Sequence, residues 1–160
     1  MLKYRAEGQM QEHRMTIPEA YEILKQGPTA IIIRKDYRES LLGQGIARPD
    51  QLLRSGQAAA GERRGRGRVV SMPISGRPGE RMLIRQYLRG GLLRFFNRDL
   101  YWQDRRPSRE LLLTVQAAAA GIPTSQVLAA VCVPCTGPFW RGYLIVRELA
   151  SCCDLPEYLQ

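Results

Sequence analysis

One segment carries the complete pattern of a long helix, while the other apolar stretches are short runs between turn residues. Pro107 and Ser108 precede the segment 109–120, and Gly121 and Pro123 follow it, as is usual for residues that start and stop a helix. The side chains expected on its buried face are Leu111, Leu112, Val115 and Ala119. One main helix among short strands predicts an α+β fold with a mostly antiparallel sheet.

The remaining elements are predicted from β-branched runs and from local start signals. Thr16 to Glu19 resembles a helix start and predicts a short helix over 18–25, and Pro49 opens another that closes near Gly56. The expected strands are 30–34, 69–70, 81–87, 127–133 and 143–146. Because a turn at 76–79 separates two of these strands, they are expected to form a hairpin, with the glycine-rich stretch 56–68 leading into it.

Composition places the chain among ordinary globular proteins. Its 160 residues are 44% hydrophobic and 24% charged, a balance that excludes a disordered or collagen-like chain and suits one compact domain. No apolar stretch approaches the roughly 20 residues that span a bilayer, and the polar segment 1–14 lacks the apolar core of a signal peptide. A cytoplasmic location is therefore expected.

The net charge of +9 comes almost wholly from arginine, because Lys3, Lys25 and Lys35 are the only lysines. Guanidinium groups bind phosphate oxygens in pairs, so an anionic partner is expected. Charge alone leaves three partners open, namely nucleotide phosphates, nucleic acid and an anionic lipid surface.

Three features together fit phosphoryl transfer, although each has a more ordinary interpretation. Gly61, Gly65 and Gly67 would let backbone N–H groups approach phosphates, but they also suit a flexible loop. Arg85 in a strand could contact a nucleotide, or it could be a solvated arginine. Glu110 in the first turn of the main helix could pair with Arg85, or it could stabilise the helix dipole. The combination of a strand cation and a helix glutamate is that of a protein-kinase-like small lobe.

Four consecutive blocks of sequence resemble the lipopolysaccharide kinase family, closest to its Kdo kinases. The blocks are GERRGRGRVV, MLIRQYLRGGLLRFFNRDLYW, RPSRELLLTVQAAAAGIPTSQVLAAVCV and GYLIVREL. The resemblance covers about residues 56 to 160, and its most specific part is the R-x-Y-x-R-G-G-L core within 85–94. The resemblance implies a kinase-like fold and an enzyme that uses ATP and Mg²⁺ to phosphorylate an inner-core sugar of lipopolysaccharide. It also implies peripheral attachment to the inner membrane.

The resemblance also implies roles for individual residues. Gly65 and Gly67 would shape the phosphate loop, Arg85 would be the phosphate cation paired with Glu110, and the backbone of Glu148 and Leu149 would contact adenine. Most kinase-like folds have lysine where this sequence has Arg85. Residues 1–55 are expected to form an N-terminal extension with short helices and a strand, which could add a strand to the sheet, and 56–160 a kinase-like small lobe that reaches the hinge.

No catalytic residue is assigned within the chain. The base aspartate and the metal ligands of a kinase come from its large lobe, which would lie beyond Gln160, so this chain alone is expected to be inactive. The alternative functions are a pseudokinase scaffold or a nucleic-acid-binding domain that uses the arginine-rich segment 63–68. Nucleic acid is disfavoured, because this segment has no aromatic residues for base stacking.

The four cysteines are not expected to bind a metal. Cys132 and Cys135 form one C-x-x-C pair, but Cys152 and Cys153 are adjacent, a spacing unlike a second zinc knuckle. Buried thiols are expected instead.

Overall fold

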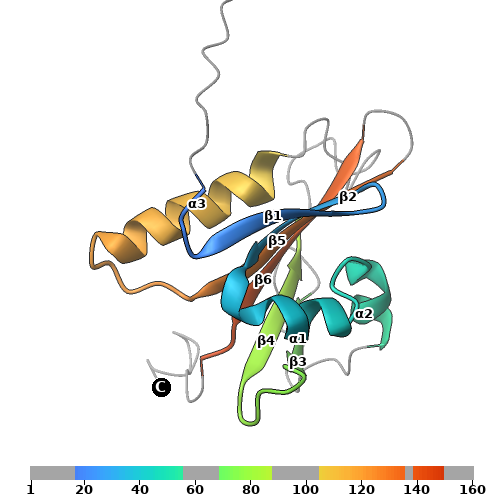
Figure 1. The fold of residues 1–160 in the computed structure, drawn as a ribbon, viewed down its shortest axis with the longest axis horizontal. Coiled ribbons are helices and arrows are strands. Elements are labelled where there is room, and N and C mark those ends of the chain that lie inside the picture. Colours follow the sequence, from blue (N-terminus) through green and yellow to red (C-terminus); the bar gives the residue numbers. More distant parts are fainter. Residues whose placement is uncertain (1–16, 56–68, 88–104, 136–138, 150–160) are drawn as a thin grey trace, which may run out of the picture.

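The computed structural model describes residues 17–55, 69–87, 105–135 and 139–149. Their core is one six-stranded sheet in the order β1-β2-β5-β6-β4-β3, in which every pair of neighbouring strands is antiparallel (Figure 1). The strands are β1 (Tyr21–Gln26), β2 (Thr29–Arg34), β3 (Val69–Pro73), β4 (Arg81–Gln86), β5 (Val127–Pro134) and β6 (Trp140–Arg147). The predicted α+β class with an antiparallel sheet is confirmed.

The prediction of a helix over 18–25 is wrong, because residues 21–26 form strand β1 and residues 18–20, just before it, are not helical. A turn at Gly27 and Pro28, with Gly27 at φ 56°, reverses the chain so that β1 pairs with β2 from Tyr21↔Arg34 to Gln26↔Thr29. A glycine at positive φ followed by one more residue is a favoured hairpin turn. The strongly β-forming partner strand β2 therefore overrides the helix-start signal before β1.

The other predicted elements in the described ranges lie close to their expected positions, and most are longer than expected, although β4 ends one residue earlier. Helix α2 spans Pro49–Ser55, and helix α3 spans Arg105–Ala119, so α3 begins four residues before the predicted start. It ends at Gly121 (φ 78°), where the N–H of Ile122 donates to the carbonyl of Ala117 at 3.0 Å, a glycine-capped end. Ala119 is exposed rather than buried. A 3₁₀ turn, Lys35–Tyr37, and helix α1, Arg38–Gly43, were not predicted.

The two faces of the sheet are covered by different helices, α3 on one side and the pair α1–α2 on the other (Figure 1). On the α3 side, Leu111 and Leu112 pack with Tyr87 and Leu144. On the α1–α2 side, the buried side chains are Ile31, Ile33, Tyr37, Leu41, Ile46, Leu53, Val70, Ile74, Met82, Ile84, Leu128, Ala129, Val131, Tyr143 and Ile145. Strand β5, between β2 and β6, is buried on both faces, which explains its continuous apolar sequence.

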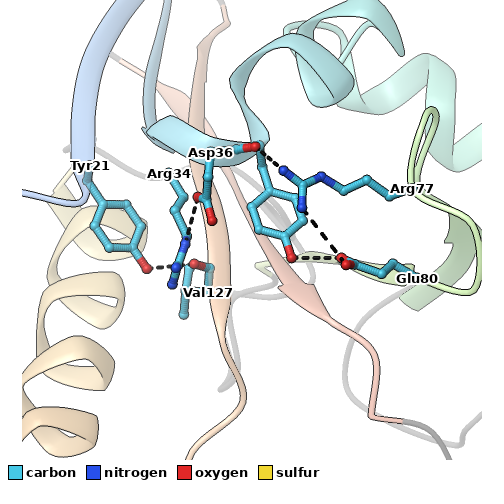
Figure 2. Close-up of polar contacts among 7 residues, drawn as sticks. Tyr21, Arg34, Asp36, Arg77, Glu80 and Val127 are labelled. Atoms are coloured by element: carbon cyan, nitrogen blue, oxygen red, sulfur yellow. Dashed lines mark hydrogen bonds and ion pairs between the residues drawn. The ribbon is translucent and has the colours of Figure 1, made fainter.

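Polar contacts join residues 17–55 to the rest of the sheet, as Figure 2 shows. The Tyr37 hydroxyl donates to Glu80 Oε2 at 2.7 Å, and the Arg77 guanidinium stacks 3.9 Å above the Tyr37 ring while donating to the carbonyl of Asp36. Strands β1 and β2, which belong to this segment, also lie in the same sheet as the later strands. The proposed division of the chain at residue 55 stays a prediction.

None of the helices in the described ranges combines the length and the apolar character that crossing a bilayer requires.

Candidate functional site

On the side of the sheet that faces α3, strands β3, β4 and β6 form a surface in which residues paired across the strands lie in rows. Arg85 lies on this side, because its register partner Leu144 packs with the α3 leucines, whereas Ile84 belongs to the opposite core. The register gives three rows across the strands: Val69–Arg85–Leu144, then Ser71–Leu83–Val146, then Arg81 beside Glu148. Leu83 and Val146 are only partly buried, so the middle row is an incompletely covered apolar surface.

Arg85 and Glu110 are brought together across the gap between β4 and α3. Arg85 Nη1 lies 3.8 Å from Glu110 Oε1, and the two side chains are 58% and 38% exposed. At this distance the two groups form an ion pair but are too far apart for a direct hydrogen bond. A pair this exposed contributes only about 0.2–1 kcal/mol to stability. The guanidinium therefore keeps donors directed toward solvent, where an anion can reach them.

Tyr87 lies beneath this ion pair and is flanked by two guanidinium groups. The guanidinium carbons of Arg85 and Arg106 are 5.8 and 5.6 Å from the centre of its ring. The Tyr87 hydroxyl is buried and makes no hydrogen bond of good geometry to a described residue. Burial, and after it the nearby Glu110 carboxylate, raise the pKa of this hydroxyl far above its usual value.

A glycine allows the start of α3 to lie against the sheet. A Cβ on Gly142 would sit 2.5 Å from Cγ of Pro107 and 3.4 Å from Cδ2 of Tyr87. The carbonyl of Gly142 also accepts a 2.9 Å hydrogen bond from the N–H of Tyr87. Because Pro107 is in the first turn of α3, this close approach fixes the position of Glu110 one turn later.

Glu148 follows β6 at the other end of the surface and is held by three contacts. Its N–H donates to the carbonyl of Arg81 at 2.9 Å, and its carboxylate accepts from Arg81 Nε at 3.0 Å and from the Ser71 hydroxyl. The N–H of Glu148 is therefore already used in pairing with β4. Leu149 itself is 53% exposed.

Two of the residues expected in the site, Gly65 and Gly67, lie outside the described residues, as does Gly61. Cys132 is a buried thiol and Cys135 a partly buried one, and Cys152 and Cys153 are also outside the described ranges. In the part of the chain that the structure describes, no group of three or more His, Cys, Asp or Glu side chains could hold a metal ion.

Sequence analysis missed the residues that support the site, namely Ser71, Arg81, Tyr87, Pro107 and Gly142. Tyr87 was available as the tyrosine of the R-x-Y motif, and Gly142 as the first residue of the block GYLIVREL. Ser71 and Arg81 gave no signal, since their contact with Glu148 depends on pairing between strands more than 60 residues apart in sequence.

Comparison with known proteins gives one family. The sequence model of the lipopolysaccharide kinase (Kdo/WaaP) family matches residues 50–160, which is well over half of the chain. Neither the curated proteins nor the solved structures gave a match. The matched residues include α2 except for Pro49, all of α3 and strands β3 to β6, and therefore all of the surface described above.

Proposed function

Because this chain belongs to the lipopolysaccharide kinase (Kdo/WaaP) family, we propose that its α3-side surface binds the ATP of a sugar kinase. The reaction is transfer of the γ-phosphate to a Kdo or inner-core sugar of lipopolysaccharide. The observation that carries the proposal is the ion pair between Arg85 on β4 and Glu110 on α3. Kinases use such a strand-to-helix pair to hold the cation that contacts the nucleotide phosphates.

The spacing along the strands supports a nucleotide of this length. Arg85 and Arg81 are four residues apart on β4, which corresponds to about 13 Å at the usual strand rise. The phosphates would lie near Arg85, and the base near Glu148 and Leu149. Leu83 and Val146, in the row between these two ends, would pack against the base. An extended nucleotide spans a comparable distance, and an apolar surface with polar groups at both ends suits it.

The described residues fit ATP better than they fit its metal ion. Arg85 supplies a guanidinium that binds two oxygens, and Glu110 orients it. Mg²⁺ prefers carboxylates and phosphate oxygens, and the described residues offer no cluster of carboxylates for it. When bound, Mg²⁺ would neutralise charge on the phosphates. We propose that the described residues bind the nucleotide and orient its phosphates.

Family membership alone supports the acceptor and the location. The family's substrate is the lipopolysaccharide core, and the net charge of +9 is suited to an anionic glycolipid and to an anionic membrane surface. We therefore propose peripheral attachment at the inner membrane, and we assign no described residue to the acceptor. No observation on the described residues favours nucleic acid, since the arginine-rich segment 63–68 lies outside them.

Calorimetric titration of ATP with Mg²⁺ into the wild-type chain and into Arg85→Gln tests the proposal. Hydrogen bonds to charged groups contribute about 1.5–3 kcal/mol, so the variant should bind ATP at least about tenfold more weakly. Arg54→Gln is the matched control, because it removes the same charge from an exposed position on α2, on the other side of the sheet.

Equal losses in the two variants would show that Arg85 acts only through net charge. ATP binding that is unchanged in Arg85→Gln would remove this residue from the phosphate site and overturn the proposed geometry.

A further inference from the structure

Three side chains at the end of the α3-side surface form a compact polar cluster, which we call the Ser71–Arg81–Glu148 cluster. The Ser71 hydroxyl donates to Glu148 Oε2 and accepts from Arg81 Nη2 at 2.8 Å. Arg81 Nε also lies 3.0 Å from the same carboxylate oxygen. Every pair within the cluster is therefore in direct contact.

The cluster is built into the sheet and is not an incidental surface contact. Ser71 is 4% exposed, one of two buried polar residues in the described ranges, the other being Thr29. A buried hydroxyl needs hydrogen-bond partners, and both partners of Ser71 come from the cluster. In addition, the backbone N–H of Glu148 donates to the carbonyl of Arg81 and extends the β4–β6 pairing past the end of β6.

The cluster therefore fixes the direction in which the chain leaves the sheet. Glu148 is attached to both β3 and β4, and Leu149 is the next residue. With the Glu148 N–H in use, the nearest backbone groups for a ligand are the Glu148 carbonyl and the Leu149 N–H, and the cluster determines where they point.

We propose that Ser71 and Arg81 are positioning residues that hold the backbone of Glu148 and Leu149 for the base of the nucleotide. This inference rests on the proposed ATP site and deepens it. It divides the surface into a phosphate end, which depends on Arg85, and a base end, which depends on the cluster. The two ends should then respond separately to substitution.

The test uses the whole chain and three probes: ATP, adenosine and inorganic tripolyphosphate. Ser71→Ala and Arg81→Gln should weaken adenosine and ATP binding by about three- to tenfold, as expected for loss of one or two hydrogen bonds, and leave tripolyphosphate affinity unchanged. Arg85→Gln should weaken tripolyphosphate and ATP and leave adenosine unchanged.

Arg147→Gln is the matched control for Arg81→Gln. Arg147 is at the same end of the sheet and also forms an ion pair, with Nη2 3.6 Å from Glu80 Oε1, but this pair lies on the α1–α2 side. Its loss should leave the affinities for adenosine and tripolyphosphate unchanged. Equal weakening of adenosine binding by Arg81→Gln and Arg147→Gln would overturn the positioning role.

Amide hydrogen exchange provides a readout that needs no nucleotide. In Ser71→Ala, the Glu148 N–H should exchange several-fold faster than in the wild type, while amides in the centre of β6 keep their rates. Unchanged exchange at Glu148 would reject the cluster as a support for this segment. If exchange rises but the wild type binds none of the three probes, the structural role stands and the ATP site itself fails.

Discussion

On the α1–α2 side of the sheet, polar side chains are paired above a large core, whereas on the α3 side the core is smaller and several polar groups are weakly paired. The Tyr143 hydroxyl donates to Asp50, and Tyr37 donates to Glu80. On the α3 side, Arg85 and Glu110 are 3.8 Å apart and the Tyr87 hydroxyl lacks a good hydrogen bond to the described residues. The first face therefore carries the larger core, and the weakly paired groups near the start of α3 on the second face are those that we propose to bind a ligand.

The largest expected effect is a core deletion on the α1–α2 side. Leu41 on α1 is 0% exposed, so Leu41→Ala should lower the free energy of unfolding by about 2–5 kcal/mol in urea titrations. Leu113→Ala on α3, where the side chain is 55% exposed, should cost less than about 0.5 kcal/mol. Similar losses in both variants would show that the outer surface of α3 is covered in solution.

Gly142→Ala should have the next largest effect, and it separates stability from ligand binding. The added methyl group would displace Pro107 and move the start of α3, at a cost of about 1–3 kcal/mol in stability. Because Glu110 moves with α3, ATP affinity should also fall. Ile46→Val, a core variant of the α1–α2 side that should cost about 0.5–1.5 kcal/mol, should keep its ATP affinity when folded. Retained affinity in Gly142→Ala would contradict the role of this close approach.

Alkaline pH should destabilise both faces through their buried tyrosines. Burial raises the pKa of Tyr87 and of Tyr143, with Glu110 and Asp50 respectively adding to the shift. A raised pKa in the folded state means that stability is intact below the unfolded value of about 10 and falls as pH rises above it. Each tyrosine should contribute up to about 1.4 kcal/mol per pH unit.

Urea unfolding at pH 9 to 11 checks this slope in the wild type, Tyr87→Phe and Tyr143→Phe. Each substitution should make the loss of stability with pH less steep. If neither does, the two hydroxyls ionise as readily in the folded chain as in the unfolded one.

Local patterns predicted the elements of this fold well where the start and stop signals lie beside the element. Helix α3 and strand β5 are such cases, since proline or glycine lies close to both ends of each. Strand β1 was predicted as a helix because its state is decided by pairing with β2. The partners Arg85 and Glu110 were named from sequence, but Ser71 and Arg81 could not be, because only strand register places them beside Glu148.

The smallest expected effect, the coupling between Arg85 and Glu110, is the most direct test of how the α3 side works. A double-mutant cycle with Arg85→Gln and Glu110→Gln should give a coupling of about 0.2–1 kcal/mol in urea unfolding without nucleotide, because the pair is exposed and 3.8 Å apart. In ATP titrations, the same cycle should give a larger coupling, since Glu110 can orient Arg85 only while Arg85 remains to bind phosphate. The cycle of Arg77→Gln and Glu80→Gln on the other face serves as the control, and ATP should leave its coupling unchanged. Equal couplings with and without ATP at Arg85 and Glu110 would mean that this ion pair is part of the scaffold, and the contrast between the two faces would then lie in packing alone.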